Sequence, residues 1–244
     1  IGSSVNDMSH WVMAQLNRGK YNDQQVIPAA AIAQTLLPHS ILGNGGHLYN
    51  SGHFSLYGLG WMLEEYCGKE IVSHTGGVNG FVTSVTLLPE EKLGIIVFTN
   101  TDQNNFYEAL KWEIADAYLG KPYRDYSKVY LGFYTQQKNE NEKKDKKMQD
   151  SVALQLKLTL PVTNYCGSYF NDVYGALTVL QEDGALKMKF SHHPQMYAKL
   201  QAIGGNRFYA TFSDPEFGKA VFPFKTTNGK VTAVTVKVAD FIEY

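Results

Sequence analysis

The sequence is short of cysteine, of net charge and of long apolar runs. It has two cysteines, Cys67 and Cys166, among 244 residues, which is too few for a disulfide scaffold and leaves one disulfide or two free thiols open. The formal net charge is −1, so no bulk field draws the chain to nucleic acid or to an anionic membrane. No apolar run approaches the roughly 20 residues that span a bilayer. Apolar residues still make up 44%, enough for a buried core in one large domain or two small ones.

The first residues lack the features of a complete N-terminus. Ile1 is not a Met, and no charged-then-apolar signal segment follows it. We therefore expect this chain to be a piece of a longer protein.

Local patterns predict helices and an antiparallel sheet in the first half of the chain. Ser3 or Ser4 is a suitable N-cap for a helix that Gly19 ends, and Pro28 opens a second, short helix. A Gly-rich loop over 43–52 leads into four predicted strands, at 56–66, 69–74, 80–88 and 93–100. Asp102 then caps a helix whose apolar stripe is predicted to contain Phe106, Leu110, Ile114 and Ala117.

The composition changes after residue 120. Residues 121–161 include a run of charges of both signs, "QQKNENEKKDKKMQD", which indicates a solvated helical linker rather than a binding tail. From residue 162 onward, short strands alternate with turn signals, namely Asp183-Gly184, Gly204-Gly205 and Asn228-Gly229. Roughly six to eight such strands without an intervening helix predict a small β-barrel or sandwich over 162–244.

The segment "IVSHTGGVNGFVTSVTLLPEEKLGIIVFTN" carries the first chemical signal, His74-Thr75-Gly76-Gly77 at the end of an apolar run. Two glycines let a substrate backbone approach a strand closely, and a backbone N–H there is able to donate to a developing oxyanion. Thr75 adds a hydroxyl, and position 74 adds histidine, whose side chain titrates near neutral pH. The same residues also suit a plain strand that ends in a Gly-rich turn beside a surface histidine. The pattern alone leaves both interpretations open.

Several stretches, in one order, resemble the penicillin-binding protein and serine β-lactamase superfamily. His-Thr-Gly at 74–76 resembles the third motif, Lys-Thr-Gly, in which related esterases and peptidases often carry His for Lys. The other stretches are "SSVNDMSHWVMAQLNRG", "YGLGW", "LLPEEKLGIIVFTN" and "FYEALKWEIADAYLG". The resemblance covers roughly residues 1–120. It implies an α+β fold, the C-terminal part of a β-lactamase/transpeptidase-like domain with an antiparallel sheet flanked by helices.

The resemblance implies a serine hydrolase that works through an acyl-enzyme on an ester, amide or β-lactam. A nucleophilic Ser, activated by a Lys three residues on, attacks the carbonyl, and water or an amine then releases the acyl group. Gly77 would supply one oxyanion N–H, while Thr75 and His74 would hold the substrate carboxylate or a hydroxyl network. We therefore predict His74, Thr75 and Gly77 as catalytic residues and, as substrate-binding residues, Gly76, Asn79, His47 and His53.

The nucleophile motif of this family is absent from the chain. None of the serines from Ser3 to Ser213 has a Lys three residues later, and Tyr169-Phe170-Asn171 lies on the wrong side of the third motif. We expect the full-length protein to be the enzyme, the missing N-terminal part of the domain to be this chain's partner, and this chain alone to be inactive. The alternative is a non-catalytic binding or assembly protein that keeps the scaffold. β-Lactams, peptides with D-residues and simple esters all stay open as substrates.

Residues 162–244 resemble the lipocalin-like C-terminal domain of some of these hydrolases, on the stretch "YCGSYFNDVYGALTVLQEDGALKMKF". A barrel of about eight strands either holds a small ligand or is filled by side chains, and the sequence decides neither. His192-His193 gives no persuasive metal site, because adjacent strand residues point to opposite faces, so we expect no metal and no cofactor. The remaining expectations are a periplasmic or extracellular location, a small-molecule or peptide substrate, a homo-oligomer and no nucleic-acid partner.

Overall fold

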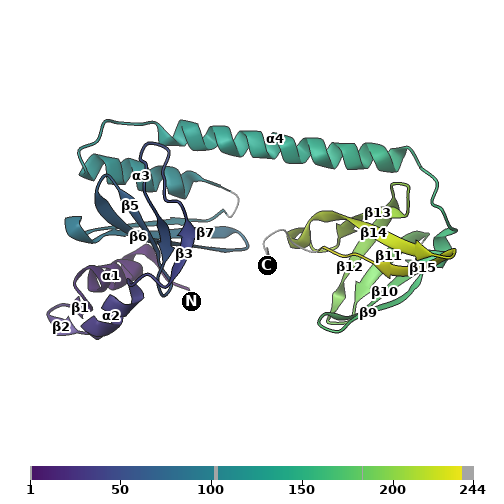
Figure 1. Ribbon diagram of the computed structural model, residues 1–244, viewed down its shortest axis with the longest axis horizontal. Coiled ribbons are helices and arrows are strands. Elements are labelled where there is room, and N and C mark those ends of the chain that lie inside the picture. Colours follow the sequence, from purple (N-terminus) through teal and green to yellow (C-terminus); the bar gives the residue numbers. More distant parts are fainter. Residues whose placement is uncertain (1, 102–103, 183, 238–244) are drawn as a thin grey trace. The chain divides into compact units, whose positions relative to one another are not determined.

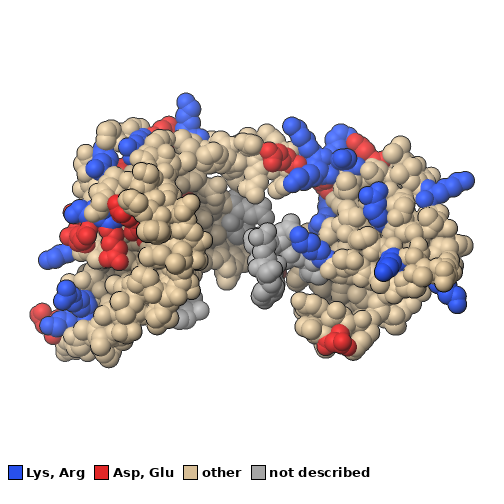
Figure 2. Space-filling view, in the orientation of Figure 1, with Lys and Arg blue, Asp and Glu red and all other residues tan. Residues whose placement is uncertain are grey.

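A computed structural model describes residues 2–101, 104–182 and 184–237 (Figure 1). The chain forms two compact units, Ile1–Gln137 and Lys138–Tyr244. On the face seen in Figure 2, side chains of both charge signs are present on each unit. Within the described residues, no helix is long and apolar enough to cross a membrane. The expected helix cap Asp102 and turn residue Asp183 lie outside these residues.

The first unit is an antiparallel sheet with helices on both faces. Its helices are α1 (Val5–Leu16), α2 (Ala29–Thr35), α3 (Phe106–Tyr118), the start of α4 (Tyr126–Ala153) and the 3-10 turn η1 (Pro89–Glu91). A separate pair of short strands is β1 (Lys20–Tyr21) and β2 (Gln24–Gln25). The main sheet has the order β3-β4-β5-β6-β7-β8, formed by β3 (Ser40–Gly43), β4 (Ser55–Tyr57), β5 (Met62–Tyr66), β6 (Lys69–Val78), β7 (Phe81–Leu88) and β8 (Leu93–Thr99).

The predicted first two helices are confirmed, with their end signals. The Ser4 hydroxyl caps α1 by accepting from the Asp7 N–H at 3.1 Å. Gly19 follows the helix at φ 85°, and its N–H donates to the Ala14 carbonyl at 2.7 Å. Pro28 occupies the N-cap position of α2.

The prediction of one strand over 56–66 is wrong, because the chain turns in the middle of it. β4 ends at Tyr57 and β5 begins at Met62. Gly58 lies so close to α2 that a Cβ there would meet the Thr35 carbonyl oxygen at 2.2 Å, and Gly60 takes φ 86°. The two glycines therefore mark a turn that the apolar residues around them concealed.

Each face of the main sheet has its own apolar core. On the α1 face, the buried residues are Val12, Trp61, Leu63, Val72, Val85 and Leu87. On the other face, α3 and the first turn of α4 cover a cluster that includes Tyr66, Ile71, Leu88, Ile95, Val97, Trp112 and Tyr126. β8 contributes to the second core and also lies under α1, so its nearly continuous apolar sequence matches a strand that is covered on both faces.

The predicted apolar stripe of α3 is correct in its middle and wrong at its ends, because Leu110 and Ile114 are half-buried and pack against the core. Phe106 and Ala117 are exposed, whereas Ala109, Trp112 and Ala115 are buried against the sheet. Two alanines on the inner face let the helix approach closely enough for Trp112 to fill the remaining space. Large apolar residues alone were therefore a poor guide to the orientation of this helix.

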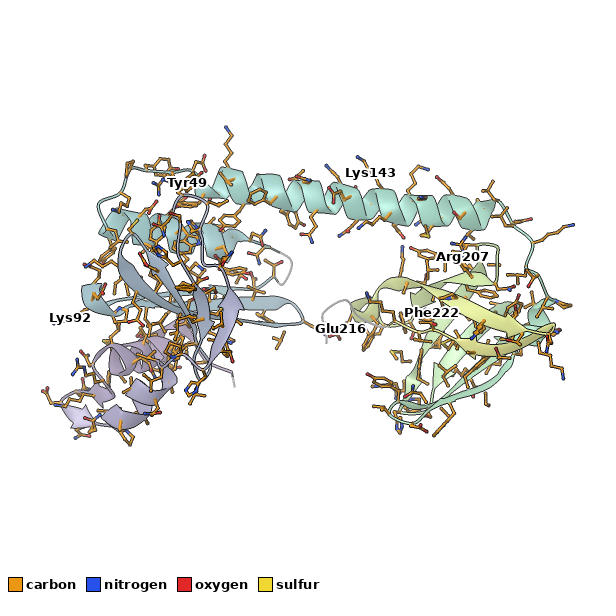
Figure 3. All side chains as sticks on the ribbon, viewed as in Figure 1. Tyr49, Lys92, Lys143, Arg207, Glu216 and Phe222 are labelled. Atoms are coloured by element: carbon orange, nitrogen blue, oxygen red, sulfur yellow. The ribbon has the colours of Figure 1, made fainter. Side chains whose placement is uncertain are left out.

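Helix α4 runs from Tyr126 to Ala153 and includes the charged run. Tyr126 is buried in the first unit, while most of the charged residues are exposed, for example Lys143 in Figure 3. Further along, Asp145 accepts hydrogen bonds from the Tyr209 hydroxyl and from Lys219 Nζ, the latter at 2.7 Å. The second half of this helix is therefore attached to the second unit by defined contacts.

In the described residues, the second unit is a seven-stranded antiparallel meander that forms a nearly closed barrel, which confirms the predicted small barrel of six to eight strands. Its interior is filled by a cluster that includes Tyr165, Met188, Phe208 and Phe222, the last of which is labelled in Figure 3. The short helix η2 (Val162–Tyr165) lies against both β10 and β15. The strands are β9 (Gly167–Asn171), β10 (Gly175–Glu182), β11 (Ala185–Phe190), β12 (His193–Ala202), β13 (Arg207–Phe212), β14 (Lys219–Thr227) and β15 (Lys230–Val234).

Candidate active site

The His-Thr-Gly-Gly segment lies inside β6, and the expectation that it ends a strand is wrong. β6 continues to Val78 and pairs with β7 all the way, through His74↔Val85 and Gly77↔Val82 to Val78↔Phe81. The chain turns at Asn79-Gly80, where Gly80 takes φ 82°. An Asn-Gly pair between two strand segments is a recognised hairpin signal, so the sequence did contain the true position of the turn.

The same segment has a strand partner on one side only. β5 pairs with β6 no further than Met62↔Ser73. From His74 to Val78, the strand register of the described residues gives a partner in β7 alone. Since every second backbone N–H of a strand points to the same side, this part of β6 presents backbone donors along an open edge. An open edge of this kind is what an oxyanion-binding N–H requires.

Neither packing nor backbone conformation in this chain requires glycine at positions 76 and 77. Neither residue has a positive φ, and a Cβ at Gly76 would come no nearer than 3.6 Å to the Thr83 Oγ1. A Cβ at Gly77 would lie 3.5 Å from Val82, which is ordinary contact. Gly94 is different, because a Cβ there would lie 2.2 Å from Val12 Cγ1 of α1. Glycine weakens a strand interior, so the exposed pair at 76 and 77 favours the close approach of a group from outside the chain.

A pocket of about 410 Å³ opens on the α1 face of the sheet beside this segment. His74, Thr75 and Gly76 line it, together with Met8, Trp11, Gln15, Thr35, Leu59, Gly60, Trp61, Thr83 and Val85. Helix α1 forms one side of the pocket because Val12 packs against Gly94 of β8 and leaves Met8, Trp11 and Gln15 facing the opening. The structure thus brings three of the predicted site residues into one pocket.

Tyr57 contacts His74 directly and was missed as a site residue. The Tyr57 hydroxyl lies 3.0 Å from His74 Nε2, at hydrogen-bonding distance, and His74 is otherwise exposed. Tyr57 is the first residue of "YGLGW", a stretch that carries the family resemblance but that gave no prediction of a site residue. A hydrogen bond to one ring nitrogen fixes which nitrogen carries the proton and how the ring is turned. Tyr57 is therefore a candidate positioning residue for His74.

The other predicted site residues do not line the pocket. Gly77 lies one residue further along β6, and Asn79 is in the hairpin turn. The ring of His47 packs against Trp112 of α3 in a tilted arrangement, with centroids 3.8 Å apart, on the other face of the sheet. His53 is on the surface, 3.7 Å from Glu65, with its side chain 80% exposed. His47 and His53 therefore lie apart from His74 and from the pocket.

A cluster of strongly perturbed ionisable groups surrounds His47. Asp116 accepts from the Tyr66 hydroxyl at 2.5 Å and from the Tyr126 hydroxyl at 2.9 Å, and it forms an ion pair with Arg124 at 3.1 Å. Burial, and then the hydrogen bond to Asp116, raise the pKa of Tyr66 well above its usual range. Burial and the neighbouring Lys111 lower the pKa of His47 to about 4. Because these partners are enclosed by the apolar core of α3 and α4, we interpret the network as structural.

The described residues contain no cluster of three His, Cys, Asp or Glu side chains that would hold a metal ion. Cys67 and Cys166 are both free thiols. The polar groups of the pocket are therefore backbone groups and the side chains of Gln15, three threonines and His74. Such groups are suited to bind a carbonyl and to stabilise charge that develops on its oxygen.

The chain is similar to known proteins in both of its halves. Residues 1–119 match the family model described as beta-lactamase, and residues 155–243 match a domain of unknown function, DUF3471. The chain is 29% identical over 167 residues to a protein named unguisins hydrolase ungD from Aspergillus violaceofuscus. It is 30% identical over 135 residues to unguisins hydrolase ungD' from Aspergillus campestris.

These relatives are much longer than the region of similarity. The matched regions make up 64% and 53% of this chain but only 30% and 25% of the two hydrolases. Among solved structures, an octameric penicillin-binding protein homologue from Pyrococcus abyssi aligns with a TM-score of 0.42 and 14% identity, over 92% of this chain and 44% of that one. A structure of SurE aligns with a TM-score of 0.34 and 16% identity, over 92% of this chain and 45% of that one.

Proposed function

Since residues 1–119 belong to the β-lactamase family, we propose that this chain carries the third-motif wall of a serine hydrolase active site. The observation that supports this most directly is the open edge of β6. His74, Thr75, Gly76 and Gly77 lie where the strand has no partner on one side, and neither glycine is required by packing within the chain. A carbonyl placed along this edge would receive backbone N–H groups, with the Gly77 N–H as the proposed oxyanion donor.

The proposed reaction is acyl transfer to a serine and then to water. The serine oxygen attacks the carbonyl carbon, its proton passes to a base, and the bond from that carbon to the leaving group breaks as the leaving group takes up a proton. Water then attacks the acyl-serine, which releases the acid and restores the hydroxyl. In this scheme Gly77 stabilises the charged oxygen, while Thr75 and His74 hold the substrate through hydrogen bonds.

We propose that the serine and its lysine belong to a part of the protein outside this chain. No serine of this sequence has a Lys three residues later, and the two hydrolase relatives extend well beyond the matched region. The chain alone should then lack hydrolase activity, because binding and oxyanion groups without the nucleophile keep only a small residual effect.

Mass spectrometry of acyl adducts tests this proposal. The full-length protein and the 244-residue chain are each incubated with nitrocefin and with p-nitrophenyl esters, and the intact mass of each protein is measured. We expect a stoichiometric serine adduct on the full-length protein and none on the chain. A serine adduct on the chain alone would overturn the division of the site, and the absence of any adduct on either protein would favour a non-catalytic binding protein.

A further inference from the structure

The pocket beside the third motif has an apolar, largely aromatic lining. Trp11 and Trp61 stack with ring centroids 5.6 Å apart and an interplanar angle of 20°. Trp61 is buried, whereas Trp11 is 36% exposed and Leu59 is 54% exposed, so both of these side chains are accessible to a ligand. Met8 and Val85 add further apolar surface. A rigid aromatic pair of this kind provides a large contact area for a small apolar group at a low entropic cost.

The part of the pocket that this chain supplies offers no fixed charge. None of the described residues that line it is Lys, Arg, Asp or Glu, and its polar side chains are Gln15, three threonines and His74. His74 is engaged through Nε2 by the Tyr57 hydroxyl. A carboxylate that lay against these residues would lose water without gaining an ion pair with a permanent cation of this chain, and an unpaired charge is costly to desolvate. A neutral carbonyl or amide would lose much less.

We propose that this pocket selects substrates that present an uncharged apolar group, aromatic or branched aliphatic, next to a neutral ester or amide. The apolar group would contact Trp11, Leu59 and Trp61, while the carbonyl would lie along the open edge of β6. This inference narrows the substrate class of the proposed hydrolase site. The expected hydrolysis rests on the proposed function, whereas the expected binding to this chain does not. It disfavours substrates that require a free carboxylate at this position.

Binding to the 244-residue chain tests the selectivity without any need for a nucleophile. Three ligands are compared by NMR titration at pH 8: N-acetyl-phenylalaninamide, the carboxylate N-acetyl-phenylalanine, and N-acetyl-glycinamide. We expect saturable shifts of the Trp11 and Trp61 indole N–H signals with the first ligand. Binding of the other two should be weaker by about tenfold or more, because one brings an unpaired charge and the other lacks the apolar group.

Variants test separately the apolar contact and the preference for an uncharged ligand. Leu59→Ala removes an exposed apolar contact without touching the core and should weaken binding of the phenylalaninamide severalfold, and Trp11→Ala should do the same. Phe106→Ala, on α3 and outside the pocket, removes a side chain that is 56% exposed and serves as the matched control, which should leave binding unchanged. His74→Lys supplies the missing cation and should reduce or reverse the preference for the amide over the carboxylate.

Each alternative outcome counts against the proposal. If the carboxylate binds the chain as tightly as the amide, or if no ligand gives saturable shifts, the pocket does not select neutral apolar groups. An unchanged preference in the His74→Lys chain would overturn the electrostatic argument. The adduct experiment on the full-length protein tests a separate point. It gives no adduct when the protein lacks the serine nucleophile, whichever ligand this pocket binds.

Discussion

The imidazole of His47 packs against the indole of Trp112, with ring centroids 3.8 Å apart and an interplanar angle of 40°, and neither of its ring nitrogens has a hydrogen-bond partner among the described protein atoms. Tyr66 and Tyr126 also contact the ring. Burial, and then the cation of Lys111, lower the pKa of this histidine to about 4. The packing of the 43–52 loop against α3 therefore keeps the His47 side chain in its neutral form.

This arrangement predicts that the first unit loses stability in mild acid. In the unfolded chain, histidine takes up a proton as the pH falls through about 6.5. In the folded chain, His47 takes up a proton only near pH 4. The free energy of unfolding should therefore decrease as the pH falls from about 6.5 to about 4, and His47 should cause no further decrease below pH 4. All three tryptophans lie in the first unit, so tryptophan fluorescence during urea unfolding measures this unit.

Replacing His47 by Phe should flatten the decrease in the urea midpoint between about pH 6.5 and 4. His53→Gln is the control, because His53 belongs to the same loop but is 80% exposed, and it should keep the wild-type pH dependence. Equal pH dependence in wild type and in His47→Phe would show that His47 does not cause the loss.

Tyr57→Phe should disturb His74 without disturbing the fold. The phenyl ring keeps the packing of tyrosine and removes only the hydroxyl that lies 3.0 Å from Nε2. Loss of one such hydrogen bond, worth about 1 kcal/mol, should lower kcat/KM of the full-length protein about fivefold. In the 244-residue chain, the imidazole nitrogen shifts of His74 should change toward a mixture of tautomers. Tyr118→Phe on the exposed side of α3 is the control, and unchanged nitrogen shifts in Tyr57→Phe would exclude a positioning role.

Two glycine substitutions should separate function from packing in the same sheet. Gly94→Ala forces a Cβ to within 2.2 Å of Val12 Cγ1 and should lower the stability of the first unit by about 1–3 kcal/mol. Gly76→Ala meets no atom closer than 3.6 Å and should leave the stability unchanged, or raise it by about 0.5 kcal/mol, since alanine loses less backbone entropy. Urea unfolding followed by fluorescence measures both.

For the full-length protein, Gly76→Ala should reduce acyl-adduct formation although the fold is intact. A variant that unfolds like Gly94→Ala would mean that Gly76 is needed for packing. A stable variant with full activity would mean that no substrate approaches this position closely.

The contact between Asp145 and its two partners should hold the second half of α4. Hydrogen bonds from Lys219 and then Tyr209 lower the pKa of Asp145. Asp145→Ala should therefore increase amide hydrogen exchange over residues 140–153, measured at neutral pH by mass spectrometry. Asp150→Ala is the matched control, because Asp150 pairs with Lys146 of the same helix at 3.0 Å, and it should have a smaller effect. Equal exchange in the two variants would show that the Asp145 contact does not order the helix.

Short-range signals in the sequence predicted most of the elements correctly. The Ser4 cap, the end of α1 near Gly19 and the final hairpin of the sheet are determined by residues close together in the chain, and all three occur in the structure. The resemblance of residues 1–120 to the β-lactamase superfamily is also confirmed by the match over residues 1–119. Local hydrogen bonds and side-chain periodicity carry this information, and they act over a few residues.

Other features depended on contacts between distant residues. The turn at Gly58–Trp61 exists because α2 lies against Gly58, and the buried face of α3 was decided by how closely its alanines approach the sheet. The sequence alone identified His74, Thr75 and Gly76 as one motif, but only the tertiary structure joined them to Tyr57, Trp11 and Trp61 and separated them from His47. The point at which β5 stops pairing with β6 depends on strand register across the sheet. Register is set by long-range pairing and packing, so the open edge that defines the candidate site could be recognised only in the folded chain.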